Sequence, residues 1–505
     1  MRIFISAIAG TAMGSLAGLL SELGHDVAGS DTAFFPPMGP ALREWGVRCF
    51  EGFDPELLQG QSHGGLSPDV LIVGNVCRKD NPQVLRAAEL GIERIHLADA
   101  LRRFVLPQTS SLVVAGTHGK TTTSTLCAEL LNAAGLEPGY LIGGVPQSHG
   151  RSFRPAGKRR LFNSASPQNV RATPFVLEGD EYDTAFWEKT AKFLHYDADV
   201  TIITSIEHDH IDIYPQFADY QLAFERLVLG LKPTGLLIAY AGDPHVVAVA
   251  ARAPCPVAYY GLEGEDYHGV SPHWLAAPAQ TDQTGTSFDL FAGGVLAGRF
   301  LCPLSGTHNL KNSVAALAAC AQGYGAPIRG LMRPLAEFQG VKRRQEVIGT
   351  PRGITVYDDF AHHPSAVSET LQGLRARHKT GKLVAIFEPR SATACRGLHQ
   401  HAYERAFDSA THVLLAPVGR SELPPEERLD VATLAHDINE RGATWSQHDA
   451  RTGMGPVAWA LPDVDSIILK ALSLAEPGDT IAILSNGAFG GIHGKLLSAL
   501  APAAG

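Results

Sequence analysis

The chain has 505 residues, too many for one hydrophobic core, since domains usually contain roughly 100–200 residues, and we therefore expect about three domains. Hydrophobic residues make up 45% and charged residues 18%, as in an ordinary globular protein, and no apolar run of about 20 residues could span a bilayer. The formal net charge of −9 excludes the general positive field of a nucleic-acid-binding protein, so we expect neither nucleic acid nor a membrane as a partner.

The seven cysteines are scattered singly and include no CxxC pair. This spacing argues against a disulfide framework or a zinc site, and we expect a cytoplasmic protein. The first ten residues, MRIFISAIAG, are apolar but run into a glycine turn without a small-residue cleavage site. We interpret them as a first strand.

Apolar β-rich runs alternate with helical stretches along the chain, a pattern typical of α/β domains with mostly parallel sheets. Breaks at residues 106–111 and 339–344 predict domains 1–108, 109–340 and 341–505. Residues 146–173, rich in Ser, Pro, Gly and basic side chains, are expected to form a surface loop with little structure. The expected strands are Arg2–Ile8, Val70–Gly74, Leu112–Ala115, Phe175–Leu177, Val200–Thr204, Leu236–Ala239, Ile354–Tyr357, Leu383–Phe387, His412–Ala416 and Thr480–Leu484.

The first expected strand leads into a turn, AIAGTAMG at 7–14, that resembles a dinucleotide-binding turn, with Asp31 about twenty residues further on. Alanines occupy the first two glycine positions. A site for a different diphosphate is therefore favoured over a nicotinamide site.

The strongest local signal is GTHGKTT at 116–122, between the apolar strand LVVA and a helical run. In this context the backbone N–H groups and the helix N-terminus bind phosphate oxygens, while Lys120 reaches the outer phosphates and Thr121 can ligate Mg²⁺. The loop has fewer residues between its glycines than the common GxxxxGKT form. The alternative is a glycine-rich turn that contains a lysine by accident.

Two acidic segments follow predicted strands: EGDEYD at 178–183 and EHDHID at 207–212. Carboxylates at a strand end near a phosphate loop are a usual way to hold hydrated Mg²⁺, although a solvated acidic turn is the alternative for the first segment. Because sites in open parallel sheets form where strand ends gather, we expect these segments to converge on the phosphate loop.

Three further clusters lie in the second half of the chain. GTHNLKN at 306–312 opens an alanine-rich helix and offers two amides on one face for a base or ribose, or simply caps the helix. FQGVKRR at 338–344 places guanidinium groups at the second expected boundary, where they suit phosphate. YDDFAHHP at 357–364 offers a carboxylate and imidazoles at another strand end.

Taken in this order, GTHGKTTT, EGDEYD, SIEHDH, GTHNLKN, FQGVKRR and YDDFAHHP resemble the motifs of the Mur ligase family over essentially the whole chain. The resemblance implies a Rossmann-like N-terminal domain for a UDP-sugar, a central P-loop ATPase domain, and a C-terminal Rossmann-like domain that closes over ATP and brings a peptide. It also implies ATP and Mg²⁺ as cofactors.

The resemblance assigns residues to four groups of roles. Lys120, His210, Arg344 and Asp359 are expected to be catalytic, and Thr121, Glu178 and His210 to hold metal. The residues expected at ATP are Gly116, Thr117, His118, Gly119, Lys120, Thr121, Thr122, Asn309, Asn312 and Arg344. Those expected at the UDP-sugar are Gly10, Thr11, Gly14, Asp31 and Asn75, and those expected at the peptide are His362 and Arg390.

Within the family, the segments at 143–146, 178–196, 387–393 and 485–497 resemble the branch that joins the tripeptide L-Ala-γ-D-Glu-meso-diaminopimelate to UDP-N-acetylmuramate in peptidoglycan recycling. The alternative branch adds L-alanine to the same nucleotide. Two alternative functions outside the ligases are a dehydrogenase and a non-catalytic nucleotide-regulated binding protein. A dehydrogenase would leave the phosphate loop unexplained. Small-molecule substrates are the expected partners of a monomer or weak homo-oligomer.

Overall fold

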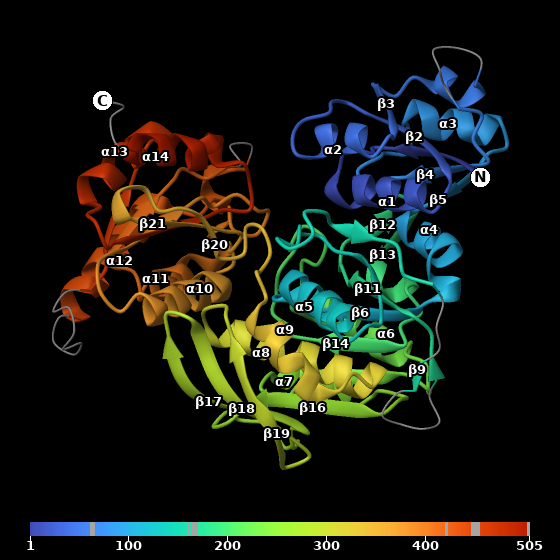
Figure 1. The fold of residues 1–505 in the computed structure, drawn as a ribbon. Helices are drawn as coiled ribbons and strands as arrows, with labels where there is room; N and C mark the ends of the chain where they lie inside the picture. Colours follow the sequence, from blue (N-terminus) through green and yellow to red (C-terminus); the bar gives the residue numbers. More distant parts are fainter. Residues whose placement is uncertain (61–65, 159–161, 164–169, 420–422, 446–454, 502–505) are drawn as a thin grey trace.

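A computed structural model describes residues 1–60, 66–158, 162–163, 170–419, 423–445 and 455–501. Three α/β domains follow one another along the chain, blue, cyan to yellow, and orange to red in Figure 1, and each contains its own main sheet. The expected boundaries near residues 108 and 340 fall between these sheets.

The N-terminal domain is a parallel five-stranded sheet with the order β3-β2-β1-β4-β5, which confirms the expected Rossmann-like architecture. Its order reverses between β1 and β4, so a ligand crevice is expected at the carboxyl ends of these two strands. The elements are β1 (Arg2–Ser6), α1 (Thr11–Glu22), β2 (Asp26–Asp31), α2 (Met38–Glu44), β3 (Arg48–Glu51), η1 (Pro55–Gln59), β4 (Val70–Val73), α3 (Pro82–Glu89), β5 (Glu93–Ile95), α4 (Leu97–Phe104) and η2 (Leu106–Gln108).

The central domain is built on a ten-stranded sheet with the order β19-β18-β17-β16-β15-β14-β6-β11-β7-β8. Its elements are β6 (Ser110–Ala115), α5 (Lys120–Ala133), β7 (Gly139–Leu141), β8 (Phe153–Arg154), β9 (Phe162–Asn163), β10 (Val170–Arg171), β11 (Pro174–Glu178), β12 (Asp183–Ala185), β13 (Glu188–Ala191), η3 (Lys192–His195), β14 (Val200–Ile203), α6 (Phe217–Leu229), β15 (Leu236–Tyr240), α7 (Pro244–Ala250), β16 (Val257–Leu262), β17 (Trp274–Asp282), β18 (Gly285–Ala292), β19 (Val295–Cys302), α8 (Thr307–Ala318), η4 (Ala319–Gly323), η5 (Ile328–Leu331) and α9 (Met332–Ala336).

Strand β6 lies between β11 and β14, and the three strands are parallel. Their residues are nearly all buried, which fits the continuous apolar runs from which these strands were predicted. Because the carboxyl ends of parallel strands share one edge of the sheet, the loops after β6, β11 and β14 meet there. This confirms the expected convergence of the phosphate loop with the two acidic segments.

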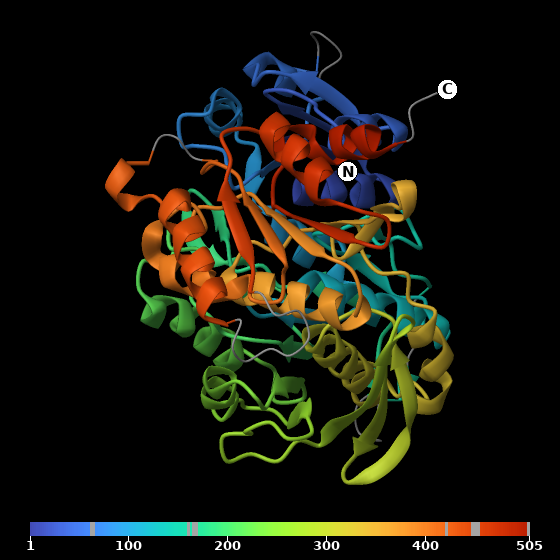
Figure 2. The same cartoon turned by 90° about the vertical axis from the view of Figure 1, so that its left-hand side faces the viewer.

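At the other end of the central sheet, β17, β18 and β19 form an antiparallel extension that projects at the bottom of both views (Figures 1 and 2). This extension was not expected from the sequence. Its strands are half exposed, and Pro278 in β17 and Gly298 and Arg299 in β19 interrupt the apolar runs that mark buried parallel strands.

The C-terminal domain has a six-stranded sheet with the order β20-β21-β25-β22-β23-β24, parallel except for its edge strand β20. Its elements are β20 (Glu346–Gly349), η6 (Pro351–Gly353), β21 (Thr355–Asp359), α10 (Pro364–Arg377), β22 (Leu383–Phe387), η7 (Gly397–His399), α11 (Gln400–Ala406), β23 (His412–Leu415), η8 (Pro425–Glu427), α12 (Val431–Trp445), β24 (Val457–Ala460), α13 (Val464–Leu474), β25 (Thr480–Leu484), η9 (Phe489–Gly491) and α14 (Ile492–Leu500).

The hydrophobic cores connect the domains unequally. One apolar cluster continues from the N-terminal domain into the central domain, whereas the two faces of the C-terminal sheet have separate clusters of their own. A domain that shares little apolar surface with its neighbour is free to change its position relative to that neighbour. The C-terminal domain is therefore the part of the fold best suited to open and close.

The segment from residue 146 to 158 corrects an expectation. It was predicted to be a surface loop, but it contains β8, and Phe153 is 0% exposed. The Phe153 ring packs edge-on against Trp45 at 4.8 Å, and the hydroxyls of Ser15 and Ser152 form a buried hydrogen bond of 2.5 Å. The segment therefore joins the N-terminal and central domains. Residues 159–161 and 164–169 of the predicted loop lie outside the described residues.

Among the described residues, none of the helices combines the length and apolar character that crossing a membrane requires.

Candidate active site

The phosphate loop connects β6 to α5 and is held tightly between two neighbours. Gly116 and Gly119 adopt left-handed backbone conformations with φ of 134° and 78°. A Cβ at Gly116 would collide with the side chain of Thr204 after β14, and one at Gly119 would collide with the Asn312 amide on α8. Because α5 begins at Lys120, its free N–H groups face the loop, as anion binding requires.

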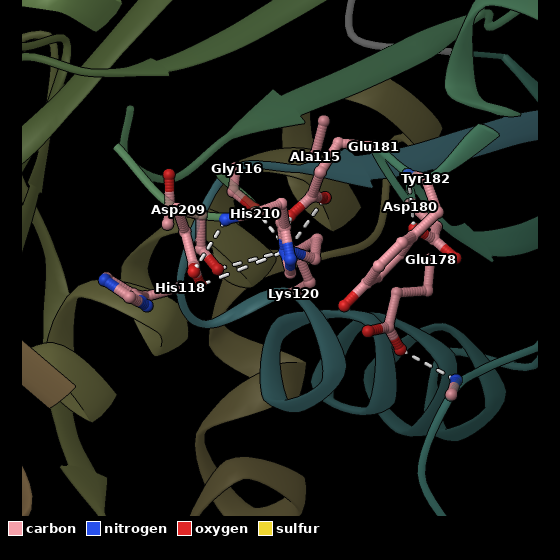
Figure 3. Close-up of polar contacts among 12 residues, drawn as sticks. Ala115, Gly116, His118, Lys120, Glu178, Asp180, Glu181, Tyr182, Asp209 and His210 are labelled. Carbon is pink, nitrogen blue, oxygen red and sulfur yellow. Dashed lines mark hydrogen bonds and ion pairs between the residues drawn. The ribbon is translucent and has the colours of Figure 1, made fainter. Parts of the chain in front are cut away.

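Lys120 is folded back onto this loop (Figure 3). Its Nζ donates hydrogen bonds to the carbonyls of Gly116 and Thr117 at 2.6 and 3.1 Å, and to Oε1 of Glu181 at 3.0 Å. Burial alone would lower the pKa of Lys120, but the Glu181 and Glu178 carboxylates raise it overall. The lysine is therefore an ammonium ion, held where it can meet a phosphate.

Glu178, at the end of β11, accepts a hydrogen bond from Thr121 Oγ1 at 2.9 Å and another from the Gly143 amide at 2.7 Å. Burial raises the pKa of Glu178, and Lys120 opposes this shift. A half-buried carboxylate beside a threonine hydroxyl is a suitable oxygen pair for a hard cation such as Mg²⁺. The residues expected to hold metal at the loop thus lie in contact with each other.

His210 lies beside a different carboxylate from the one expected. The sequence interpretation placed His210 with Glu178, but its Nε2 lies 2.8 Å from Oε1 of Glu181, which is 0% exposed (Figure 3). Burial lowers the pKa of His210, but the Glu181 carboxylate raises it by more, so the pKa increases overall. The Tyr182 ring covers His210 at a centroid distance of 4.4 Å. Glu181 therefore bridges Lys120 and His210.

The amides of α8 lie against the phosphate loop, as their assignment to a nucleotide requires. Both Asn309 and Asn312 are buried, and the Asn312 amide donates to Asn309 Oδ1 at 3.3 Å. Asn309 itself donates to the Ser305 carbonyl at 2.8 Å. This pairing fixes the Asn312 side chain beside Gly119.

The two arginines that open the C-terminal domain point in different directions. Arg343 donates to the carbonyls of Ser485 and Gly487 within its own domain, at 2.7 and 2.8 Å. Arg344 instead reaches the phosphate loop, where it donates to Thr121 Oγ1 at 3.3 Å. Arg344 is thus the arginine of this pair that contacts the loop.

Asp359, at the end of β21, holds the backbone that carries Arg344. Its carboxylate accepts hydrogen bonds from the amides of Gln345 and Ala361 at 2.7 and 2.8 Å. Burial raises the pKa of Asp359, and the nearby Arg344 opposes this shift. The carboxylate lines the same cavity as the phosphate loop.

The two residues assigned to a peptide, His362 and Arg390, lie in different surroundings. His362 lines the cavity, and its Nε2 lies 3.9 Å from Asp209 Oδ2 in the central domain. The Arg390 side chain is 47% exposed, lies over Gly487, and approaches Glu388 only at 3.5 Å. Arg390 therefore keeps a guanidinium edge available for a ligand.

The residues assigned to the UDP-sugar lie in α1 and at the carboxyl ends of β1, β2 and β4, the edge of the sheet at which the strand order predicts a crevice. Gly10 and Thr11 are exposed at the start of α1, Asn75 is exposed after β4, and Gly14 is buried beneath Met38. Asp31 accepts hydrogen bonds from the amides of Ala9 and Thr32 at 2.8 and 2.7 Å, so its carboxylate supports the turn itself. Ala7, at the first glycine position of the turn, has a left-handed φ of 62°.

A cavity of about 350 Å³ brings residues of all three domains together. Ala12 and Leu97 contribute from the N-terminal domain, the phosphate loop and both acidic segments from the central domain, and Arg344 to His363 from the C-terminal domain. Its shape can therefore hold groups presented by different domains next to one phosphate loop.

Two of the cavity residues that received no role from the sequence make contacts among its charged groups. One is Glu181, which was quoted only as part of an acidic segment. The other is Lys192, which is buried and whose Nζ donates to Asp180 Oδ2 at 2.9 Å. A lysine twelve residues after a carboxylate carries no local signal, because only the β12–β13 hairpin brings it back.

Family models match three consecutive parts of the chain. Residues 3–108 match the model described as Mur ligase family, catalytic domain. Residues 114–320 match the Mur ligase middle domain, and residues 343–487 match the Mur ligase, glutamate ligase domain.

Related proteins match over almost their full lengths. UDP-N-acetylmuramate–L-alanyl-gamma-D-glutamyl-meso-2,6-diaminoheptandioate ligase of Escherichia coli K12 is 34% identical, covering 99% of this chain and 98% of that protein. UDP-N-acetylmuramate–L-alanine ligase of Roseiflexus sp. RS-1 is 31% identical, covering 96% of each. The crystal structure of a murein peptide ligase from Psychrobacter arcticus superposes with a TM-score of 0.68 at 32% identity, covering 100% of both chains.

Proposed function

The chain belongs to the Mur ligase family, and from that premise we propose that it joins the carboxylate of UDP-N-acetylmuramate to the amine of L-alanyl-γ-D-glutamyl-meso-diaminopimelate. Mur ligases are ATP-dependent, and the products are the amide, ADP and phosphate. The observation that carries this proposal is the cavity in which all three domains meet at one phosphate loop. A reaction between a nucleotide-linked acid, ATP and a peptide amine requires such a meeting point.

The reaction proceeds in two steps with an acyl phosphate between them. A lactyl carboxylate oxygen attacks the γ-phosphorus of ATP in line, the bond from that phosphorus to the bridging oxygen breaks, and ADP leaves. The L-alanine amine then attacks the activated carbonyl carbon and loses a proton, and the tetrahedral intermediate expels phosphate. Positioning supplies much of the acceleration, because the reacting groups are held by different domains.

The chain's own cations neutralise the charge that moves in the first step. Lys120 and the N–H groups at the start of α5 face the place of the outer phosphates, and Arg344 approaches from the C-terminal side. Preorganised donors of this kind stabilise developing charge strongly because they need no reorganisation during the reaction. Glu181 keeps Lys120 charged and oriented until the nucleotide arrives.

Thr121 and Glu178 fit a Mg²⁺ ion, with His210 as a third ligand supplied from the loop after β14. When bound, such an ion neutralises phosphate charge and orients the nucleotide. The fit rests on the donor set, because the half-buried Glu178 carboxylate accepts a hydrogen bond from the Thr121 hydroxyl at 2.9 Å, which places two oxygen ligands side by side. His210 has to leave Glu181 to take part.

Domain closure brings the amine to the acyl phosphate. The C-terminal domain has its own apolar clusters, so its contacts with the central domain can break and re-form at low cost. Because the substrates are nucleotide-linked or recycled wall fragments, we place the reaction in the cytoplasm, with small molecules as its partners.

A phosphate-release assay tests this proposal. Release should require ATP, UDP-N-acetylmuramate and tripeptide together, with stoichiometric appearance of the UDP-N-acetylmuramoyl tripeptide by mass spectrometry. Release that needs only ATP, or oxidation of NADH, would remove the ligase assignment. The relative that uses L-alanine keeps that amino acid as the second candidate for the amine.

A further inference from the structure

Two histidines and a glutamate form a second cluster in the cavity, apart from Thr121, Glu178 and His210. His118 lies in the phosphate loop, Glu207 follows β14, and His363 caps α10 in the C-terminal domain. Oε2 of Glu207 lies 3.5 Å from Nε2 of His118 and 3.7 Å from Nδ1 of His363. One ligand atom from each residue thus lies within 4.8 Å of the other two, across the boundary between two domains.

The imidazole nitrogens of this cluster are unsatisfied. Within the described part of the chain, Nε2 of His118 and both nitrogens of His363 are buried and have no hydrogen-bond partner. The whole His363 residue is only 7% exposed. Glu207 is by contrast oriented by Ser365, whose hydroxyl donates to Oε2 at 2.6 Å. A buried polar nitrogen without a partner costs about 1–3 kcal/mol, so an arrangement with three of them points to a missing ligand.

A comparable cluster elsewhere does not share this property. His96, Glu188 and His195 also lie within reach of one another, between α4 and the β12–β13 hairpin. However, the Asp99 amide donates to Nδ1 of His96 at 3.2 Å, so the neutral ring carries its proton on Nε2 and donates it toward Glu188, 3.2 Å away. His195 Nε2 is hydrogen-bonded to the Thr190 hydroxyl at 2.9 Å. These nitrogens have no lone pair left for a metal.

We propose that His118, Glu207 and His363 form a binding site for a zinc-class transition-metal ion that clips the phosphate loop to the C-terminal domain. Two imidazoles and one carboxylate are a known ligand set for Zn²⁺ with an open fourth position. Tetrahedral zinc with ligands at 2.0–2.1 Å separates its donor atoms by about 3.3 Å, close to the 3.5 and 3.7 Å measured here. All three residues line the cavity, so an ion could reach them from it.

This site differs in chemistry from the expected Mg²⁺ site. Thr121 and Glu178 offer oxygen atoms, which suit a hard cation, whereas the second cluster offers two imidazoles, which favour Zn²⁺ over Mg²⁺. The ligands come from both sides of the opening between the central and C-terminal domains. Bound metal therefore holds these two domains together without any nucleotide.

Equilibrium dialysis of the full-length, nucleotide-free protein against Zn²⁺ in excess Mg²⁺ tests the proposal. The wild type should bind one Zn²⁺. The affinity for this ion should fall by at least about 100-fold in His363→Ala and in Glu207→Gln, since even changes outside the metal's direct ligands lower affinity by 10- to 100-fold. The matched control His195→Ala, in the satisfied cluster, and the Mg²⁺-site variant His210→Ala should both retain it. Circular dichroism establishes that each variant is folded.

A second measurement checks the link between the domains. Zn²⁺ should raise the Tm of the wild type by mass action and leave the Tm of His363→Ala unchanged. Wild-type protein without a bound Zn²⁺, or with one that survives both His363→Ala and Glu207→Gln, overturns the proposal. Loss of the ion in His195→Ala or His210→Ala alone would assign it to one of the other sites and overturn it equally.

Discussion

Nε2 of His210 lies 2.8 Å from Oε1 of Glu181, the same oxygen that accepts a hydrogen bond from Lys120 at 3.0 Å. A single buried carboxylate therefore holds both the lysine proposed to bind phosphate and the histidine proposed to ligate Mg²⁺. Binding of nucleotide and metal must draw both cations away from Glu181 or share them with it. This carboxylate sets the charge of the site before the substrates arrive.

Replacing Glu181 by glutamine should change the response of the enzyme to pH. Glu181 outweighs burial and raises the pKa of His210, so in the wild type His210 stays protonated up to a higher pH and cannot ligate metal below that pKa. The Mg²⁺ concentration for half-maximal activity should thus increase as the pH falls. In Glu181→Gln the His210 pKa drops and this acid limb moves to lower pH, while maximal turnover falls by about 10- to 100-fold.

Mg²⁺ titrations between about pH 6 and 8.5, around the ordinary His pKa, provide the measurement. Glu188→Gln is the matched control, since Glu188 lies outside the cavity. This variant should keep the wild-type pH dependence of the Mg²⁺ requirement and a maximal turnover near that of the wild type. An acid limb that stays in place in Glu181→Gln would separate Glu181 from His210 in function.

Lys120→Ala should lower turnover by about 10²-fold or more, as loss of a preorganised charge contact typically does. The exposed Lys189, paired with Asp183, is the control, and Lys189→Ala should remain close to wild type. Steady-state phosphate release from folded, purified variants gives the comparison. Near-normal turnover of Lys120→Ala would remove this lysine from the mechanism.

Much of the fold could be predicted because buried parallel strands have a strong local pattern. The ten expected strands all lie within a residue or two of observed ones, for example Leu383–Phe387. The extension β17 to β19 was missed because its strands are half exposed and their apolar residues are interrupted, by Pro278 in β17 and by Gly298 and Arg299 in β19. Phe153 was assigned to a loop because its partner, Trp45, is more than a hundred residues away and leaves no local pattern.

The site was predictable in its parts and less so in its pairings. Strand order alone brings Glu178 and the loop after β14 to the phosphate loop, so their convergence could be expected. Which carboxylate meets His210 depends on how the chain turns after Gly179, and no periodicity encodes that turn. The unsatisfied nitrogens of His363 are likewise visible only once the domains are placed together.

The adjacent arginines Arg343 and Arg344 should affect different properties. Arg344→Ala should reduce turnover by about 10-fold or more, because a donor facing the phosphates is lost, with little change in Tm. Arg343→Ala should lower stability by about 1.5–3 kcal/mol, the range for a hydrogen bond to a charged group, because two carbonyls lose that donor. Thermal unfolding and kinetics on both variants separate the roles, and a fall in turnover confined to Arg343→Ala would reverse the assignment.

Arg390→Ala should raise the tripeptide KM while leaving the KM for UDP-N-acetylmuramate nearly unchanged. The exposed guanidinium lies 3.5 Å from Glu388, which leaves it able to bind a peptide carboxylate bidentately. Arg396→Ala is the control in the same domain, since that arginine already pairs with Glu427. An unaltered tripeptide KM in Arg390→Ala would reject its role at the peptide.

The choice of amine substrate tests the account most directly. The enzyme is incubated with ATP, UDP-N-acetylmuramate and an equimolar mixture of tripeptide and L-alanine, and the two products are separated by mass. Because the tripeptide offers remote carboxylates that can orient its amine, we predict that the UDP-N-acetylmuramoyl tripeptide accumulates almost alone. Faster formation of UDP-N-acetylmuramoyl-L-alanine would contradict the assignment and place the enzyme with the ligases that use the free amino acid.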